Sequence, residues 1–569
     1  MTTTTTPFRI IQSALKEWYY PGILAFPCYY CKSKDFLMVL EASDYTNIAR
    51  LIQLFPSNYA EMHESQPRWP LLKEKLPQAL HYINILENNK EASSLELLAH
   101  LTHGVGVFST HVVENYPQGV QLLSQALQAK QTLELKVPES IALTHAQLAD
   151  CGYRNGNYIL AITHFQLAYQ IYKLKEGNKN CDLERAFVLH ACGNAYYIIG
   201  AYSMALALFT EAGEIRLRYL SEKDIEFGYL EHDQAEALRA LGFYDEAEKL
   251  FASALEKKKS YFQTDAHTNI ALLYQCRGLL YIKSNQFELA KENLKLAFAI
   301  YLQHTEHFAE DKAALLRNDF YTMLLQLAAG NLEQAEQAID NLEVQRQGVE
   351  DKTKSIFLRI SHGKIRLFHD QNKVDCSFKQ LQDTLKTFIP KLQFKSAEKF
   401  LTEDNKVDIA SLLSQYGIEN FIQNNYQNFE ECLELLSMAL QFKRDFYQSI
   451  PNTPVELGAI NYAFSNYDFG LFYYLAGLMG SERRKKEEWF AISSEYLDKA
   501  KAQFIQAGVN PTHANILACN LLLKKITDRK NALPDLQKRV CFFQMSSKRT
   551  LDSEFEYLPC LDTILKDYP

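Results

Sequence analysis

Proline is absent from the middle of this chain. None of the 16 prolines falls between Glu139 and Ile389. Proline inside a helix costs about 3 kcal/mol, because it removes a backbone donor and its ring clashes with the preceding turn. The absence therefore allows long, uninterrupted helices in this part of the chain.

Paired cysteines, long apolar runs and excess positive charge are also missing. The 11 cysteines are an odd number and are mostly isolated, which argues against a disulfide-stapled secreted protein. No apolar stretch reaches the roughly 18 residues of a membrane-spanning helix, and the N-terminus MTTTTTPFRII lacks a signal-like apolar run. A net charge of −8 favours neither nucleic acid nor an anionic membrane. We expect a soluble cytoplasmic protein, or, if it is a secreted effector, one that works in the cytosol of another cell.

The common catalytic and cofactor motifs are absent. There is no GxxxxGK[ST] phosphate loop, and no GxSxG, HExxH or DxDxDG sequence. Gly104-Val-Gly106 lacks the third glycine of a dinucleotide-binding fingerprint, so we expect it inside a helix. The basic run Arg483–Lys486 precedes two glutamates and is expected in a solvated turn insertion, with docking as the alternative. The sequence thus predicts no enzyme, no cofactor and no nucleic-acid partner.

Metal-type spacings occur but are incomplete. Cys28-Tyr-Tyr-Cys31 has zinc or redox spacing, yet the next cysteine is Cys151, so metal binding and simple packing both stay open. Two histidine groups also lack the three or four convergent ligands that a metal needs. The first group is His100, His103 and His111, and the second is His304 and His307. We expect no metal at either group.

A repeated helical pattern fills most of the chain. Between Gly193 and Ala212 it reads as two amphipathic helices around a turn at Gly200, the second helix starting at Tyr202. The second helix of each copy begins with an aromatic residue or leucine. A small residue follows three positions later, a large apolar residue seven positions later, and a small or apolar residue ten positions later. The copies begin at Tyr116, Tyr158, Tyr202, Tyr244, Phe287 and Leu332, in steps of 42, 44, 42, 43 and 45 residues. A fixed frame over six copies predicts a repeat array.

This frame resembles the tetratricopeptide repeat. The period alone would fit HEAT or armadillo units, but the internal spacing of small and aromatic residues favours the tetratricopeptide family, whose usual period is about 34 residues. The extra length is similar to the long-helix repeats of kinesin light chains and of the tails of signalling nucleotidases. The resemblance implies an all-α, right-handed solenoid of about nine helix pairs. The nucleotide-binding module of those nucleotidases has no counterpart here, so ATPase activity is not implied.

The pattern also divides the chain. We expect an irregular helical cap over residues 1–95, a regular array over 96–350, and degenerate repeats over 351–527 with an insertion at 480–495. Residues 528–569 are more polar and are expected to form a C-terminal cap or tail, which an open solenoid end requires.

The resemblance implies a concave groove lined by first helices. Asn194 is the best match, because it follows the small Gly193, where the family often places an asparagine that bonds a peptide backbone. Side chains of this kind can bond an extended peptide, although each could also be an ordinary solvated residue. The full predicted set is Asp150, Arg154, His190, Asn194, Tyr197, His232, Asp233, Arg239, Gln275, Lys283 and Arg317.

We therefore predict a non-catalytic scaffold or adaptor that binds a protein or an extended peptide, with its oligomeric state left open. Two alternatives remain. The array could be a peptide sensor that changes its superhelical pitch, or the N-terminal residues could hold a cryptic enzyme site around Cys28, Cys31 and His63.

Overall fold

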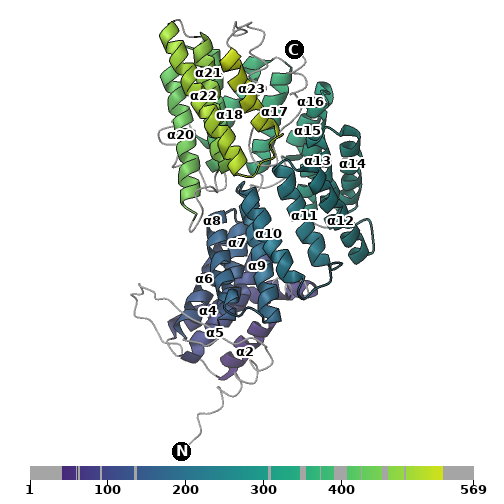
Figure 1. Cartoon of the computed structure of the whole chain (residues 1–569). Coiled ribbons are helices and arrows are strands. Elements are labelled where there is room, and N and C mark those ends of the chain that lie inside the picture. The colour runs from purple at the N-terminus through teal and green to yellow at the C-terminus, as the bar shows by residue number, and fades with distance from the viewer. Residues whose placement is uncertain are drawn as a thin grey trace, which may run out of the picture. The chain divides into compact units, whose positions relative to one another are not determined.

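The protein is an all-α array of paired helices. The computed structural model describes residues 42–58, 61, 65–89, 92–133, 138–304, 309–346, 354–371, 373–389, 406–424, 426–450, 459–479 and 482–528 (Figure 1). No strand occurs in these ranges. The first 41 residues and residues 529–569 lie outside them, so about half of the predicted N-terminal cap and nearly all of the predicted C-terminal cap are not described.

Three helical segments precede the first repeat, and nine helix pairs and a final helix follow among the described residues. The early elements are α2 (Ala42–Leu54), η1 (Gln66–Arg68) and α4 (Trp69–Asn88). The pairs are α5 (Ala92–His111) with α6 (Tyr116–Thr132), α7 (Glu139–Arg154) with α8 (Tyr158–Lys173), α9 (Lys179–Ile198) with α10 (Tyr202–Arg216), α11 (Ile225–Ala240) with α12 (Tyr244–Phe262), α13 (Thr268–Lys283) with α14 (Phe287–His304), α15 (Ala309–Ala328) with α16 (Leu332–Arg346), α17 (Lys354–Asp370) with α18 (Val374–Phe388), α19 (Lys406–Gln423) with α20 (Phe429–Gln448), and α21 (Ala459–Met479) with α22 (Arg483–Gln506). The last helix is α23 (Ala514–Asp528).

The predicted repeat frame is confirmed. Each of the six predicted second helices begins at the first residue of its frame, from Tyr116 in α6 to Leu332 in α16. In α12 the frame residues Ala247, Phe251 and Ala254 are fully buried. The small residues allow close helix approach and the aromatic ring fills the space between helices, which is why this spacing repeats.

The turns inside the pairs are built by local chemistry. Asn115 and Asn157 each accept a backbone N–H from the first turn of the helix that follows, a standard N-cap. Gly200 and Gly242 have φ of +82° and +84°, a conformation that side chains strain, so glycine ends the first helix at these two positions.

The chain divides into two compact units. Unit 1 comprises residues 1–195 and 211–219, and unit 2 comprises residues 196–210 and 220–569. A continuous apolar core in unit 1 runs from α2 to α7 and includes Phe55 and Phe108, whose rings meet edge to face at 5.4 Å. The larger cores lie in unit 2, around α13 to α20 and around α19 to α23. The boundaries predicted at 95, 350 and 527 remain predictions.

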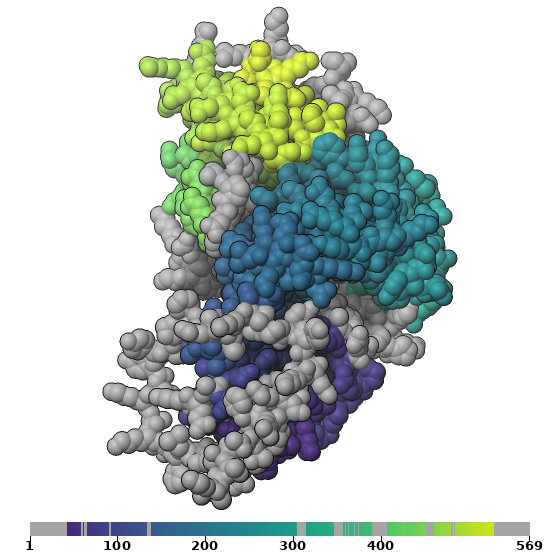
Figure 2. Space-filling model, turned by 60° about the horizontal axis from the view of Figure 1, so that its bottom comes forward, coloured from purple at the N-terminus to yellow at the C-terminus, as the bar shows by residue number. Residues whose placement is uncertain are grey.

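Within unit 2 the last helices contact an early repeat. The connection between α22 and α23 bonds the turn between α11 and α12, where the backbone N–H of Asn510 donates to the carbonyl of Leu241 at 2.8 Å. Tyr447 of α20 donates to the carbonyl of Ile199 at 2.6 Å. In Figure 2 the yellow surface of the last helices adjoins blue-teal surface of earlier ones. Unit 2 is therefore closed by contacts between its beginning and its end.

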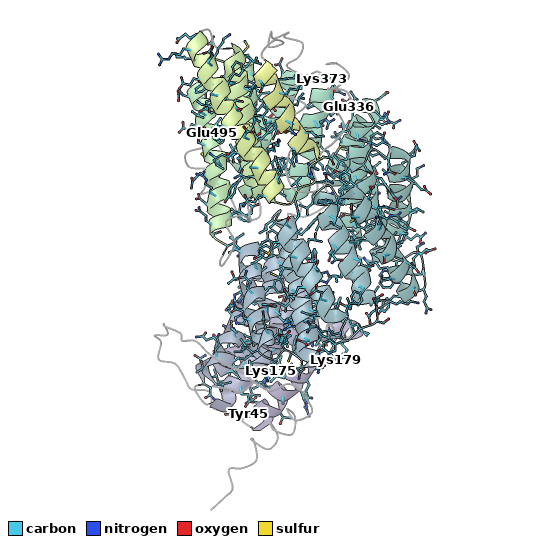
Figure 3. All side chains as sticks on the ribbon, viewed as in Figure 1. Tyr45, Lys175, Lys179, Glu336, Lys373 and Glu495 are labelled. Carbon is cyan, nitrogen blue, oxygen red and sulfur yellow. The ribbon has the colours of Figure 1, made fainter. Side chains whose placement is uncertain are left out.

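One local prediction is wrong. The basic run Arg483–Lys486, expected in a turn insertion, forms the first turn of α22, which continues without interruption to Gln506. Arginine, lysine and glutamate are good helix formers, and Lys485 pairs with Glu482 at 3.1 Å. Charged side chains such as Glu495 on α22 and Lys373, which precedes α18, are exposed (both are labelled in Figure 3).

Candidate partner-binding surface

In unit 1, α7 carries a partly exposed ion pair. The Asp150 carboxylate accepts from the Arg154 Nε at 2.9 Å, one helical turn away, and lies 3.2 Å from the His111 Nε2 of α5. About a third of the Arg154 side chain and a quarter of the Asp150 side chain are exposed, at 33% and 26%. This pair can therefore still meet a ligand, although its groups already bond each other.

The two predicted residues on α9 in unit 1 differ in availability. His190 is buried, and its Nδ1 lies 3.1 Å from the Arg216 guanidinium of α10. Asn194 lies one turn further along α9 and is half-buried. Its side chain has no hydrogen-bond partner among the described residues, so its amide can both donate and accept.

In unit 2, Tyr197 and Arg239 belong to a buried network that sequence reasoning had not connected. Arg239 of α11 donates to both carboxylate oxygens of Glu236, at 3.0 and 2.9 Å. It also donates to the Tyr197 hydroxyl at 3.0 Å, while that hydroxyl donates to Glu236 at 3.0 Å. The Arg239 side chain is fully buried. The network joins α9 to α11 and holds the helices together.

His232 and Asp233 lie on α11 near a buried lysine. Lys258 of α12 donates to the His232 Nδ1 at 2.8 Å, and the His232 Nε2 lies 3.4 Å from the Cys276 sulfur of α13. Burial lowers the pKa of Lys258 to about 8, and the nearby charges of Asp233 and Cys276 oppose that fall. These side chains bridge consecutive repeats.

The remaining predicted residues lie on α13 and α15. Gln275 is fully buried and donates to the carbonyl of Ala314 at 3.1 Å, and Lys283 is buried at the end of α13. Arg317 is half-buried on α15 and has no hydrogen bond or ion pair with any other residue that the structure describes. Arg317 therefore resembles Asn194 in having no polar partner among the described residues.

Burial separates the predicted set into two classes. The buried members are His190, His232, Arg239, Gln275 and Lys283, which the sequence analysis had placed on an open groove. The first helix of the neighbouring repeat covers part of the face that an isolated pair would leave open, as Cys276 does for His232. Ligand binding by these residues stays a prediction. The other class consists of the half-buried or exposed members, Asp150, Arg154, Asn194, Tyr197, Asp233 and Arg317.

Sequence reasoning missed a set of buried basic residues on the second helices, two of which bond buried histidines. Lys130, Arg216, Lys258 and Lys443 are all buried, and each follows the first residue of its second helix by 14 positions. A basic residue recurring at one position of a repeat is a signal that could have found them. Their partners lie on first helices, as the two histidine pairs show.

Several other predicted features can now be placed. Gly104 and Gly106 lie inside α5, where a Cβ would meet Phe55 and Leu123, so both glycines serve close packing. Among the described residues no three histidine, cysteine or acidic side chains converge as metal ligands. Cys28, Cys31, His63 and His307 lie outside the described residues. No helix in the described part of the chain is long and apolar enough to cross a bilayer.

Comparisons with known proteins yield structural likeness only. No protein-family model matches the sequence, and no curated protein matches it. The crystal structure of BtubC (BKLC) from P. vanneervenii is 17% identical, with a TM-score of 0.33, over 42% of this chain and 90% of that one. A Rap protein complexed with competence and sporulation factor is 15% identical, with a TM-score of 0.46, over 71% of this chain and 99% of that one. These values are too low to support any functional argument.

Proposed function

We propose that this chain is a non-catalytic scaffold of the tetratricopeptide type that binds a protein or an extended peptide along its first helices. Asn194 carries the proposal, because it is the predicted backbone-binding asparagine and its amide has no partner among the described residues. An extended peptide presents unpaired N–H and C=O groups, and a side-chain amide can bond both. Asp150 and Arg154, on α7, supply charges for recognition of the peptide's side chains.

The test is selection of linear peptides. A library of random peptides displayed on phage is panned against the full chain, and the affinity of enriched peptides is measured by calorimetry. Asn194→Ala should weaken binding about tenfold, because one to two hydrogen bonds to the peptide backbone are lost. Gln170→Ala is the matched control, since Gln170 is an exposed amide on the second helix α8. Equal affinity of both variants, or no enrichment of any peptide, would reject the proposal.

A peptide sensor is a second candidate, and the closing contacts of unit 2 are the interactions that such a switch would break. The contacts of Asn510 and Tyr447 with the early turns would have to break if a ligand changed the superhelical pitch. Small-angle scattering of the full chain with a selected peptide separates the two functions. A changed envelope supports the sensor, and an unchanged one supports a static scaffold.

The non-catalytic part of the proposal has its own test. The cryptic-site alternative needs Cys28, Cys31 and His63 to hold a metal, so it predicts about one zinc per chain after purification. A metal-free protein contradicts that alternative, whereas stoichiometric zinc that Cys28→Ser removes would support it.

A further inference from the structure

A buried row of three polar side chains crosses from one repeat of unit 2 to the next. It consists of Lys258 on α12, His232 on α11 and Cys276 on α13, which we name the Lys–His–Cys row. The Lys258 Nζ lies 2.8 Å from the His232 Nδ1, and the His232 Nε2 lies 3.4 Å from the Cys276 Sγ. The three residues are 1%, 5% and 8% exposed. Cys276 is thus the most exposed residue of the row.

The lysine determines where the histidine proton lies. An ammonium group has only donors, so the His232 Nδ1 must accept from Lys258. A neutral imidazole then carries its proton on Nε2, the nitrogen that faces Cys276. The sulfur accepts this N–H. A donated hydrogen bond with a cation behind it favours the thiolate over the thiol.

The same arrangement gives the thiol proton a path. The thiol of Cys276 can transfer its proton to the His232 Nε2 while the His232 Nδ1 transfers its own proton to a neutral Lys258 amine. The thiol–amine and thiolate–ammonium forms have the same net charge and differ only by this relay through His232. The surroundings fit either form: Asp233 acts on Lys258 electrostatically, the Tyr229 ring lies 5.0 Å from the Lys258 Nζ, and Phe251 meets the His232 ring at 5.8 Å.

Other buried cysteines lack this environment. Cys192 of α9 is 5% exposed, close to Cys276 in burial, and burial raises its pKa to about 12. Cys432 of α20 is fully buried, and burial raises its pKa to about 12 as well. A thiol with so high a pKa is inert at neutral pH. Cys276 therefore differs from them in its charge environment and resembles Cys192 in its burial.

We propose that Cys276 is a modification site, a thiol that His232 and Lys258 keep reactive toward small peroxides. The thiolate attacks one oxygen of the peroxide, so that an S–O bond forms while the O–O bond breaks. The sulfur is oxidised to a sulfenic acid, the peroxide is reduced, and the leaving hydroxide takes a proton from solvent to give water. A molecule of two heavy atoms suits a sulfur with this little exposure. The new oxygen enters the 3.4 Å contact between His232 and Cys276 and so pushes α11 and α13 apart.

The test uses hydrogen peroxide on the full-length protein. Sulfenic acids are trapped with dimedone and counted at each cysteine by peptide mass spectrometry over time at pH 7.5. Exposed Cys376 reports that the reagents are active, and Cys192 gives the rate of an equally buried thiol. We expect Cys276 to react at least about tenfold faster than Cys192, which corresponds to one pKa unit of thiol activation. Equal rates at Cys276 and Cys192 would overturn the proposal.

Two lysine variants separate activation from loosening of the fold. Lys258→Met should reduce the rate at Cys276 about tenfold relative to Cys192, and Lys258→Arg, which keeps the charge, should restore most of it. The rate at Cys432 reports opening of unit 2, and circular dichroism checks helix content. The Cys276 rate is therefore divided by the Cys432 rate. If this ratio is the same in Lys258→Met and in the wild type, the row does not activate the thiol.

Discussion

Asn510 donates its side-chain amide to the carbonyl of Gly242 at 3.2 Å, although 268 residues separate the two in the chain. Its backbone N–H also bonds the preceding carbonyl, that of Leu241, at 2.8 Å. Both acceptors directly follow helix α11: Leu241 is its C-cap residue and Gly242 is the next residue, where the carbonyls have no partner within the helix. The connection between α22 and α23 thus supplies hydrogen-bond donors to carbonyls at the end of a helix in a distant repeat. These directed bonds fix which turn the connection contacts when unit 2 closes.

Gly242 should be essential for this closure. A Cβ at Gly242 would come within 2.7 Å of the His513 ring, and the φ of +84° also strains any side chain. Gly242→Ala should push the α22–α23 connection away, so the Asn510 amide should exchange its hydrogen at least about tenfold faster. Hydrogen exchange read by mass spectrometry over residues 507–513 measures this.

Gly330 provides the control for that variant. Its φ is +76°, but a Cβ there would meet nothing within 4 Å. Gly330→Ala therefore carries the same backbone strain, about 1–2 kcal/mol, without the collision with His513. If both variants speed hydrogen exchange at Asn510 equally, the effect comes from backbone strain. The collision with His513 would then not be the cause of the opening.

The repeat frame makes its own prediction at Ala205. This residue is fully buried on α10, whereas Ala207 on the same helix is exposed. Ala205→Arg should overpack the helix pair and lower the free energy of unfolding by about 1–3 kcal/mol or more. Ala207→Arg should leave it within about 0.5 kcal/mol of the wild type. Urea unfolding followed by circular dichroism compares them. An unmoved transition for Ala205→Arg would mean that the register of the repeat is wrong.

The sequence predicts the fold better than the site. Frame residues such as Phe251 lie on the inward face of their second helix, so a local spacing in the sequence suffices to place them. His232 and Gln275 were predicted on an open face but are buried by the next repeat or bonded to it. Burial of that kind depends on how repeats stack. The contact of Asn510 with Gly242 depends on the closure of all of unit 2, which no local pattern encodes.

The buried ion pair of α11 should be strongly coupled. Arg239 is fully buried and forks onto Glu236, which is itself 8% exposed. Arg239→Met would leave a buried carboxylate without its cation and should cost about 3–5 kcal/mol. Glu236→Gln in the same chain removes the stranded charge and should recover part of this cost.

A double-mutant cycle measures the coupling. The free energies of unfolding of the wild type, Arg239→Met, Glu236→Gln and the double variant are obtained from urea titrations. We expect the double variant to be more stable than the sum of the single changes by about 1–3 kcal/mol. Additive costs would show that Arg239 contributes by packing its side chain rather than by pairing with Glu236.

Unit 1 should lose stability in mild acid because of a histidine pair. His145 of α7 and His164 of α8 stack with ring centroids 5.0 Å apart, and their Nδ1 atoms lie 2.7 Å from each other. One Nδ1 must carry a proton and the other must accept it, so the accepting ring is neutral. Burial of both rings disfavours a positive charge on the donating ring as well. Burial lowers the pKa of His145 to about 3, with a further effect of His164, and burial lowers the pKa of His164 to about 4.

The sign of the effect follows from proton counts. Unfolded histidine titrates near pH 6.5, so between about pH 6.5 and 4 the unfolded chain binds more protons than the folded one. Stability therefore falls as the pH falls through this window, by on the order of 2 kcal/mol per histidine between pH 7 and pH 5. Urea unfolding at the two pH values, followed by circular dichroism, measures the loss. The double variant His145→Phe/His164→Phe keeps stacked rings without titration and should lose correspondingly less. Because every other titrating group is common to both proteins, an equal loss in the wild type and the variant would show that this pair does not cause the acid sensitivity.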